Sequence, residues 1–394
     1  MITLEALNAL PAPEFVASLG GIFEHSPWVA ERAAAARPFT SRLQMLDALR
    51  AVVQAAPAAD QLALIRAHPQ LGARGRSRTQ LTEASAREQR RAGLDACTDA
   101  QFSQLLRLNE AYVEKFALPF ILAVRGHDPA SILRAIEQRS GHAAALERRT
   151  ALAQIGLIAG YRLADLVATP AGVEIIAMNA RLAAINARAA TTGGDAAAEL
   201  VSSLLREWML AAGLEVHAGR GEELVGIQRS AQGAPRSQPG AQPSEQGAQH
   251  LLIGVYYDAM AQALRVDGRL GFLIGIAVAQ QLRQRGIGLP FDLAILAHPA
   301  GEWVGNIFSH ADPDAIRGCA ALTAADIDSL PALRAAGIAD RCLAIVRQGP
   351  AGIAYRADAP LEAHTLDRAA RTLEDFLMQT QPAEGRQTGV TLHG

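Results

Sequence analysis

His68 and Glu88 are the side chains of this sequence best suited, by type and position, to move a proton. His68 stands at the end of the apolar helical pattern QLALIRAHPQLG, and Pro69 forces the backbone at His68 away from helical geometry. An imidazole has an ordinary pKa of about 6.5, so it can exchange a proton near neutral pH. A histidine at such a stiff helix exit can act in catalysis, but it can equally be structural or solvated.

Glu88 has two possible roles. With Ser85 it forms the Ser-x-x-Glu spacing of a helix capping box, so it can cap its own helix, or its carboxylate can take part in catalysis. The segment before this helix, RGRSRTQ at 74–80, is rich in arginine and has no large apolar group. We interpret that segment as a solvated face. Spacing alone leaves both roles of Glu88 open.

The elements that must position these side chains are predicted to be helices. Apolar residues recur three and four positions apart in successive segments such as RLQMLDALRAVVQAA and DAQFSQLLRLNEAYVEKF, and prolines mark several of the boundaries. No strand-like alternation interrupts the series. We therefore predict an all-helical domain over residues 1–168.

The second half of the chain has a different pattern. The apolar runs AQHLLIGVYYDAM (248–260) and FDLAILAHPA (291–300) are typical of buried strands, and GRLGFLIGIAVAQQLRQRGI between them is helical. This order predicts an α/β domain over 172–385 with a mainly parallel sheet. Residues 230–249 contain Gly, Pro, Ser and Gln with almost no apolar group. We expect a disordered loop there and a flexible tail over 386–394.

Composition restricts the kind of partner. The 394 residues carry a net charge of −2, which argues against counterion-driven binding of a nucleic acid. The three cysteines lie far apart, without the spacing of a disulfide framework or a thiolate metal site. No apolar run reaches the roughly 18 residues of a membrane helix, and MITLEALNALPAPEF lacks the features of a secretory signal. We expect a cytoplasmic protein that acts on a small molecule, with neither nucleic acid nor membrane as partner.

Five motifs stand in the first 168 residues: FEHSPWV, HPQLG, LTEASAREQRRAGL, LNEAYVEKFALPFILAVRG and AQIGLIAGYRLADL. In this order and spacing they resemble the decarboxylases of 2-oxo-4-hydroxy-4-carboxy-5-ureidoimidazoline (OHCU), an intermediate between urate and allantoin. The resemblance implies a carboxy-lyase that forms (S)-allantoin, with His68, Glu88 and Arg162 as catalytic residues. It implies substrate contacts from eight others: Pro69, Ser85, Gln89, Ile121, Leu122, Ala123, Val124 and Arg125.

The chemistry of that family fits these residue types. Loss of carbon dioxide leaves electron density on the ring, which must be delocalised and then protonated on one face. His68 is expected to supply the proton, and Glu88 either orients the imidazole and favours its charged form or contacts the substrate. Arg162 offers a planar fork for a carboxylate or ureido oxygen. The substrate is its own electron sink, so no cofactor is expected. The chain departs from the family in KFALPF, where KFGFPF is common, which places Ala117 at a structural position.

Segments of the second half, including GDAAAELVSSLLREWMLAAGLEV and LTAADIDSLPALRAAGI, are similar to the metal-dependent amidohydrolases that include allantoate amidohydrolase and N-carbamoyl-amino-acid hydrolases. The phenol of tyrosine and the sec-butyl group of isoleucine do not replace metal ligands. The resemblance therefore implies a degenerate domain without the family's lid and with no metal site. The positions that correspond to the metal-site residues of that family are Tyr256, Asp267, Glu302, Ile345 and Tyr355.

Three functions compete on these observations. The favoured one is an OHCU decarboxylase whose second half is a pseudo-hydrolase scaffold. The second is a bifunctional enzyme that also hydrolyses allantoate or a related ureide, and the third is a non-catalytic binding protein. Intact His68, Glu88 and Arg162 argue against the third, and the replaced metal ligands argue against the second. The favoured function is compatible with a homodimer and with docking to other enzymes of the ureide pathway.

Overall fold

The computed structural model describes most of the first half of the chain and separate segments of the second. The chain divides into two compact units, Met1–Thr169 and Pro170–Gly394, which are described separately below. The predicted tail at 386–394 and the predicted loop at 230–249, apart from Ser230, lie outside the described residues. The described residues are 1–72, 82–94, 97–192, 195–218, 224–230, 250–257, 267–290, 292–299, 319–322, 342–346 and 362–379.

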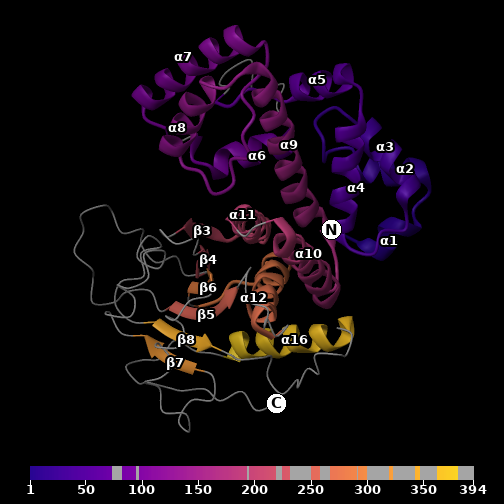
Figure 1. Ribbon diagram of the computed structural model, residues 1–394, viewed down its shortest axis with the longest axis vertical. Helices are drawn as coiled ribbons and strands as arrows, with labels where there is room; N and C mark the ends of the chain where they lie inside the picture. Colours follow the sequence, from indigo (N-terminus) through magenta and orange to yellow (C-terminus); the bar gives the residue numbers. More distant parts are fainter. Residues whose placement is uncertain are drawn as a thin grey trace. The chain divides into compact units, whose positions relative to one another are not determined.

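The first unit is helical, which confirms the predicted class of this half. In Figure 1, α9 runs between a group formed by α6, α7 and α8 and a group formed by α1 to α5. The helices are α1 (Leu4–Ala9), α2 (Ala12–Leu19), α3 (Trp28–Ala33), α4 (Arg42–Ala55), α5 (Ala58–Ala67), α6 (Glu83–Arg91), α7 (Asp99–Phe116), α8 (Pro129–Ser140) and α9 (Ala144–Leu166), with a 3-10 turn η1 (Ala34–Ala36).

One detail of this unit differs from the prediction. Two short strands, β1 (Ile2–Thr3) and β2 (Val167–Ala168), pair in parallel and join the beginning of the unit to its end. These strands lie before α1 and after α9, so they do not interrupt the series of helices, but the unit is not helical throughout. Strands of two residues are too short to show the alternating pattern from which a strand is predicted.

Local signals in the sequence explain where the helices around the pocket begin and end. Helix α5 ends at Ala67, because Pro69 holds His68 in extended geometry, with φ −77° and ψ 137°. Helix α7 begins with a capping box between Thr98 and Gln101 and ends at Phe116, followed by the cap residue Ala117, whose φ of +52° is left-handed. The chain then runs irregularly from Leu118 to the start of α8.

The core beside α6, α7 and α8 includes that irregular segment. Phe120, Leu122 and Val124 are buried in one cluster with Leu105 and Tyr112 of α7 and with apolar residues of α8. Aromatic contacts fix the segment further, since the rings of Tyr112 and Phe120 meet edge to face with centroids 5.2 Å apart. A buried segment without helix or strand is therefore held by its side chains.

The second unit contains a six-stranded sheet with helices. Helix α11 (Asp195–Ala211) contacts β3 and β4, and α12 (Asp267–Gln284) contacts β5 and β6. Helices α10 (Ala171–Thr192) and α16 (Ala363–Gln379) contact α12 and each other. The strand order is β3 (Glu215–Ala218), β4 (Leu224–Gln228), β6 (Asp292–Pro299), β5 (His250–Tyr257), β8 (Cys342–Val346) and β7 (Cys319–Leu322).

The sheet is mixed, so the predicted mainly parallel sheet was wrong for the described strands. The central strand β5 is parallel to β6 and to β8, as the strand–helix–strand pattern indicated. The pairs β3–β4, β4–β6 and β7–β8 are antiparallel. The sequence pattern located β5, α12 and β6, but the direction of a neighbouring strand depends on chain connections that periodicity does not reveal. Among the described residues, no helix is long and apolar enough to cross a membrane.

Candidate active site

A pocket in the first unit brings together residues from four parts of the chain. It is formed by the end of α5, by α6, by the irregular segment after α7 and by α9, and it encloses about 340 Å³ of space including its open mouth. Its lining combines apolar side chains with a few polar and charged ones, as the linings of small-molecule sites do. The lining residues are His68, Pro69, Leu71, Ser85, Glu88, Gln89, Phe120, Ile121, Leu122, Ile158, Val124 and Arg162.

His68 is a buried imidazole with a fixed tautomer. The side chain is 6% exposed, and its Nδ1 lies 2.9 Å from the carbonyl oxygen of Leu64. A carbonyl only accepts, so Nδ1 carries the hydrogen and Nε2 keeps its lone pair. Nε2 is buried and has no hydrogen-bond partner among the residues that the structure describes. The imidazole therefore presents an unshared proton acceptor.

The protonation state of His68 differs from the expectation. Burial lowers the pKa of His68 to about 4, outweighing the hydrogen bond to Leu64 and the charge of Glu24, which raise it. The imidazole is therefore neutral near pH 7. A neutral imidazole does not fit the suggested role in which Glu88 favours the charged form of His68, and sequence spacing could not reveal this because it does not show how deeply a side chain is buried.

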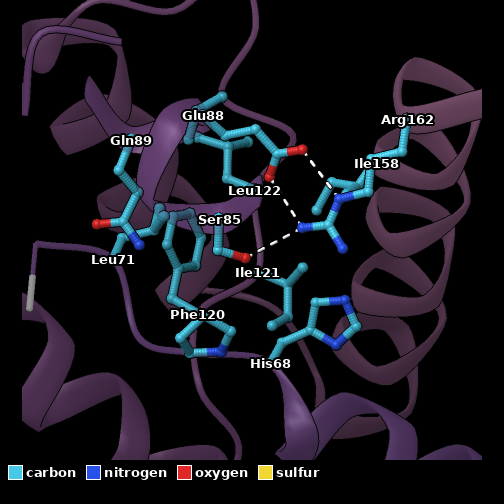
Figure 2. A pocket seen from close by; sticks show the side chains of 12 residues that line it. His68, Leu71, Ser85, Glu88, Gln89, Phe120, Ile121, Leu122, Ile158 and Arg162 are labelled. Atoms are coloured by element: carbon cyan, nitrogen blue, oxygen red, sulfur yellow. Dashed lines mark hydrogen bonds and ion pairs between the residues drawn. The ribbon is translucent and has the colours of Figure 1, made fainter. Parts of the chain in front are cut away.

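Arg162 on α9 is joined to Glu88 on α6 by a two-pronged ion pair (Figure 2). Nε lies 3.0 Å from Oε1 of Glu88, and Nη2 lies 3.0 Å from Oε2. Nη1 faces the carbonyl oxygens of Gly21 and Ile22 at 3.1 and 3.4 Å. Nη2 also contacts Glu24 and Ser85, so every N–H group of this guanidinium faces an acceptor of the protein. The fork predicted for a substrate oxygen is occupied by Glu88 in this structure.

Glu24 is a buried member of the site to which the sequence analysis assigned no role. Its side chain is 2% exposed, and Oε1 accepts hydrogen bonds from Arg162 Nη2 at 3.1 Å, from Thr82 at 2.8 Å and from Ser85. The Ser85 hydroxyl also accepts from Arg162 Nη2, at 3.0 Å. Burial raises the pKa of Glu24, but the hydrogen bond from Ser85 and the charge of Arg162 outweigh it, so the pKa is lowered. The only signal in the sequence was its place in FEHSPWV.

The capping role considered for Glu88 was wrong. Helix α6 is capped by Thr82, whose hydroxyl accepts from the backbone N–H of Ser85 at 3.3 Å. Glu88 lies in the next turn, with its side chain 23% exposed and both oxygens on Arg162. The suggested orientation of His68 by Glu88 is not what the structure shows either, because the carbonyl of Leu64 holds the Nδ1 of that ring.

The pocket contains most of the residues predicted to contact substrate. Figure 2 shows Gln89 across the pocket from Arg162. Ala123 and Arg125 do not line it: the N–H of Ala123 donates to Gln154 at 2.9 Å, and Arg125 pairs with Asp165 at 2.9 Å. Three apolar lining residues were missed, namely Leu71, Phe120 and Ile158. These belong to quoted motifs, but no pattern marked them as pocket residues.

The five positions in the second unit that correspond to metal-site residues are only partly described. The register places Tyr256 of β5 beside His298 of β6, and Ile345 of β8 beside Ile253 of β5. Asp267 is the first residue of α12. Glu302 and Tyr355 lie outside the described residues. In the part of the chain that the structure describes, no three His, Cys, Asp or Glu residues cluster as metal ligands would.

Fold and site together define a helical domain with a buried proton acceptor in a pocket lined by apolar, polar and charged side chains. The family profile named OHCU decarboxylase matches residues 8–164. A 2-oxo-4-hydroxy-4-carboxy-5-ureidoimidazoline decarboxylase of Haloferax volcanii is 44% identical over 164 residues, which are 42% of this chain and 95% of that protein. The chain therefore belongs, through its first unit, to the OHCU decarboxylase family.

Likenesses to solved structures are slight. A structure described as (S)-allantoin synthase has a TM-score of 0.35 and 30% identity, and the match covers 43% of this chain and 55% of that one. An amidase of the hydantoinase/carbamoylase family from Burkholderia multivorans has a TM-score of 0.25 and 18% identity, and the match covers 32% of this chain and 28% of that one. Neither likeness supports an argument, so family membership rests on the sequence matches.

Proposed function

We propose that the first unit decarboxylates OHCU to (S)-allantoin in urate degradation. The observation that carries the proposal is the Nε2 of His68, which has no hydrogen-bond partner among the described residues and is buried in the pocket that also contains Glu88 and Arg162. Family membership supplies the substrate class, and the pocket supplies a group able to move the proton that the reaction requires. These three residues are the proposed catalytic residues.

The reaction requires a proton to be moved as well as a bond to be broken. The carbon that loses carbon dioxide also carries the 4-hydroxyl, and in allantoin this carbon is a carbonyl while the neighbouring carbon carries a hydrogen. The electron pair of the broken bond passes into the ring, and the hydroxyl proton must leave its oxygen. One further proton per turnover enters from solvent, because a neutral molecule of carbon dioxide has left a carboxylate.

His68 is proposed to begin as a base. The bare Nε2 takes the 4-hydroxyl proton, and the imidazolium so formed returns it to the neighbouring ring carbon. Because the contact with Leu64 fixes the ring, the proton arrives on one face of the substrate, which accounts for a single enantiomer. This order agrees with a histidine that is neutral before substrate binds.

Glu88 and Arg162 are proposed to act as one rigid unit. Arg162 holds the carboxylate of Glu88 in place. The Glu88 side chain is 23% exposed, so its carboxylate can still accept hydrogen bonds from ureido N–H groups. Gln89 uses its amide oxygen to accept from the N–H of Gly72 at 3.1 Å, so its amide nitrogen is the proposed donor to a substrate oxygen. Phe120, Leu122 and Ile158 supply an apolar wall where carbon dioxide can form.

The second unit is proposed to be a hydrolase-like scaffold over 172–385 without hydrolase activity. The tyrosine and isoleucine at positions 256 and 345 support this proposal, since neither side chain is a metal ligand of the kind that a two-metal hydrolase needs. A cytoplasmic location, a homodimer and docking to other ureide-pathway enzymes belong to the same proposal. Stoichiometric zinc or manganese in the purified chain would contradict a scaffold without hydrolase activity.

The decisive assay supplies freshly generated OHCU to the purified full-length protein and follows carbon dioxide and optically active allantoin. We expect His68→Ala to lower kcat/KM about a thousandfold, as loss of a proton-transfer group does. His364→Ala removes an exposed histidine of α16 and should leave activity unchanged. Activity of His68→Ala equal to that of the wild type would refute the role of the imidazole. Failure of the wild type to release carbon dioxide would refute the function.

The pH profile tests the starting state of His68. With a pKa of about 4 and the neutral form required, kcat/KM should be constant between pH 8 and 5 and should decrease as pH falls toward 4. A value of kcat/KM that rises as the pH is lowered from 8 to 5 would show that the charged form starts the reaction. A chain shortened to residues 1–168 should keep the same profile.

A further inference from the structure

A second network of polar groups, most of them buried, lies in the first unit, outside the pocket lining. Its centre is Glu147 of α9, which is 0% exposed. Nε of Arg139 on α8 lies 3.1 and 3.3 Å from the two oxygens of Glu147, and Nη2 contacts Oε1. The hydroxyl of Tyr112 on α7 donates to the same oxygen, and Nδ1 of His142 lies 2.8 Å from Oε2. We call these four residues the support network.

Arg139 connects the support network to the pocket by two contacts. Its Nη1 donates to the carbonyl oxygen of Ile121 at 2.7 Å, and its guanidinium lies 4.6 Å from the centroid of the Phe120 ring. Ile121 and Phe120 both line the pocket, whereas Arg139 does not. The buried arginine therefore contacts the wall of the pocket from behind.

This part of the pocket wall, formed by residues 118–125, needs such contacts because of its backbone. Residues 118–125 are largely buried but form neither helix nor strand, so their peptide groups need partners from elsewhere. Arg139 supplies the donor for the carbonyl of Ile121. Gln154 of α9 supplies the acceptor for the N–H of Ala123, at 2.9 Å. Side chains on two different helices therefore supply hydrogen bonds that backbone groups would supply in a helix or a sheet.

We infer that Arg139 is a positioning residue for the proposed decarboxylation, acting through Ile121 and Phe120. It fixes the wall against which the substrate ring packs, opposite the polar groups of α6 and α9. Glu147 and Tyr112 in turn fix the guanidinium, so that its planar fork meets Glu147 on one side and the Ile121 carbonyl on another. The inference rests on the proposed function, because the wall matters only if a substrate binds there.

The test variant is Arg139→Lys. A lysine keeps the positive charge beside Glu147, but a single ammonium group cannot hold both Glu147 and the Ile121 carbonyl while covering the Phe120 ring. We expect the KM for OHCU to rise about tenfold, the factor that corresponds to about 1.4 kcal/mol of lost interaction. We expect kcat per folded molecule to change less than about threefold, as for a loss that falls mainly on binding. Arg134→Gln, which removes an exposed arginine of the same helix, should change neither value.

A merely structural role gives a different result. If Arg139 only stabilises the fold, Arg139→Lys lowers the apparent kcat in proportion to the unfolded fraction and leaves KM unchanged, which would overturn the inference. Gln154→Leu tests the same wall through the other side-chain contact, with no buried ion pair broken, and should also raise KM. An unchanged KM in Gln154→Leu would overturn the inference even if Arg139→Lys does not fold. Lack of activity in the wild type would instead overturn the proposed function.

Discussion

Two buried networks of charged groups in the first unit have similar chemistry but different exposure. In the pocket, Arg162 holds Glu24 and Glu88, and the Glu88 side chain remains 23% exposed to the open space. In the support network, Arg139 holds Glu147, which is completely buried and also accepts from Tyr112. Each guanidinium also contacts backbone carbonyls of a neighbouring segment. The same kind of ion pair therefore occurs once in the lining of a cavity and once behind it.

The difference shows what converts an ion pair into part of an active site. A carboxylate that is closed on every side can only contribute to stability and position. A carboxylate with one oxygen exposed to a cavity can also contact a substrate, but it is less deeply buried. The comparison predicts that changes in the support network act on the free energy of unfolding and, where they release the pocket wall, on KM, and that changes in the pocket network act mainly on turnover.

The largest effect on stability is expected for Glu147→Gln. The amide still accepts one hydrogen bond, but Arg139 then remains buried without a negative partner, which costs about 3 kcal/mol of unfolding free energy. Denaturant unfolding of the full chain, monitored for the first unit, would measure this loss. A loss below about 1 kcal/mol, as at an exposed pair, would contradict the distinction between the two networks.

Glu88→Gln is expected to lower activity more than it lowers the free energy of unfolding. The amide keeps the shape of the side chain but gives up its charge and one acceptor toward the substrate, so kcat/KM should fall about thirtyfold, or about 2 kcal/mol. The free energy of unfolding should change by less than about 1 kcal/mol, because the side chain is partly exposed and Glu24 still neutralises Arg162. Equal activity of Glu88→Gln and the wild type would remove Glu88 from the proposed catalytic residues.

A smaller effect is expected at the start of the wall that lies between the two networks. Ala117 ends α7 with a φ of +52°, a conformation that favours glycine. Ala117→Gly should therefore raise the free energy of unfolding by about 0.5 kcal/mol, after the gain in backbone entropy of the unfolded chain is subtracted. The KM for OHCU should stay the same. A clear loss of stability would show that the alanine side chain has a packing role of its own.

Helices and the position of His68 could be predicted from the sequence because both depend on near neighbours. Apolar spacing located the helices, and Pro69 fixed the end of α5. The capping box considered at Ser85 and Glu88 is not the cap of α6, which Thr82 forms with the N–H of Ser85, a pair that has the same spacing. Two overlapping patterns of this kind cannot be separated by spacing alone.

The charged networks could not be predicted, because their partners are brought together by the fold. Glu24 and Arg162 lie at opposite ends of the first unit in sequence, and no local pattern links them. The protonation state of His68 depends on burial and on a backbone carbonyl, which only the folded chain supplies. The antiparallel strand pairs of the second unit were missed for a similar reason, since strand direction is a property of the whole sheet.

The most direct test of the account is a nitrogen-15 NMR titration of His68 in the full-length protein, with His68→Ala used to assign the signal. The account predicts a neutral ring at pH 7, with the proton on Nδ1, a bare Nε2 and a pKa of about 4. An imidazolium at pH 7, or a neutral ring with its proton on Nε2, would contradict the claim that His68 begins the reaction as a base.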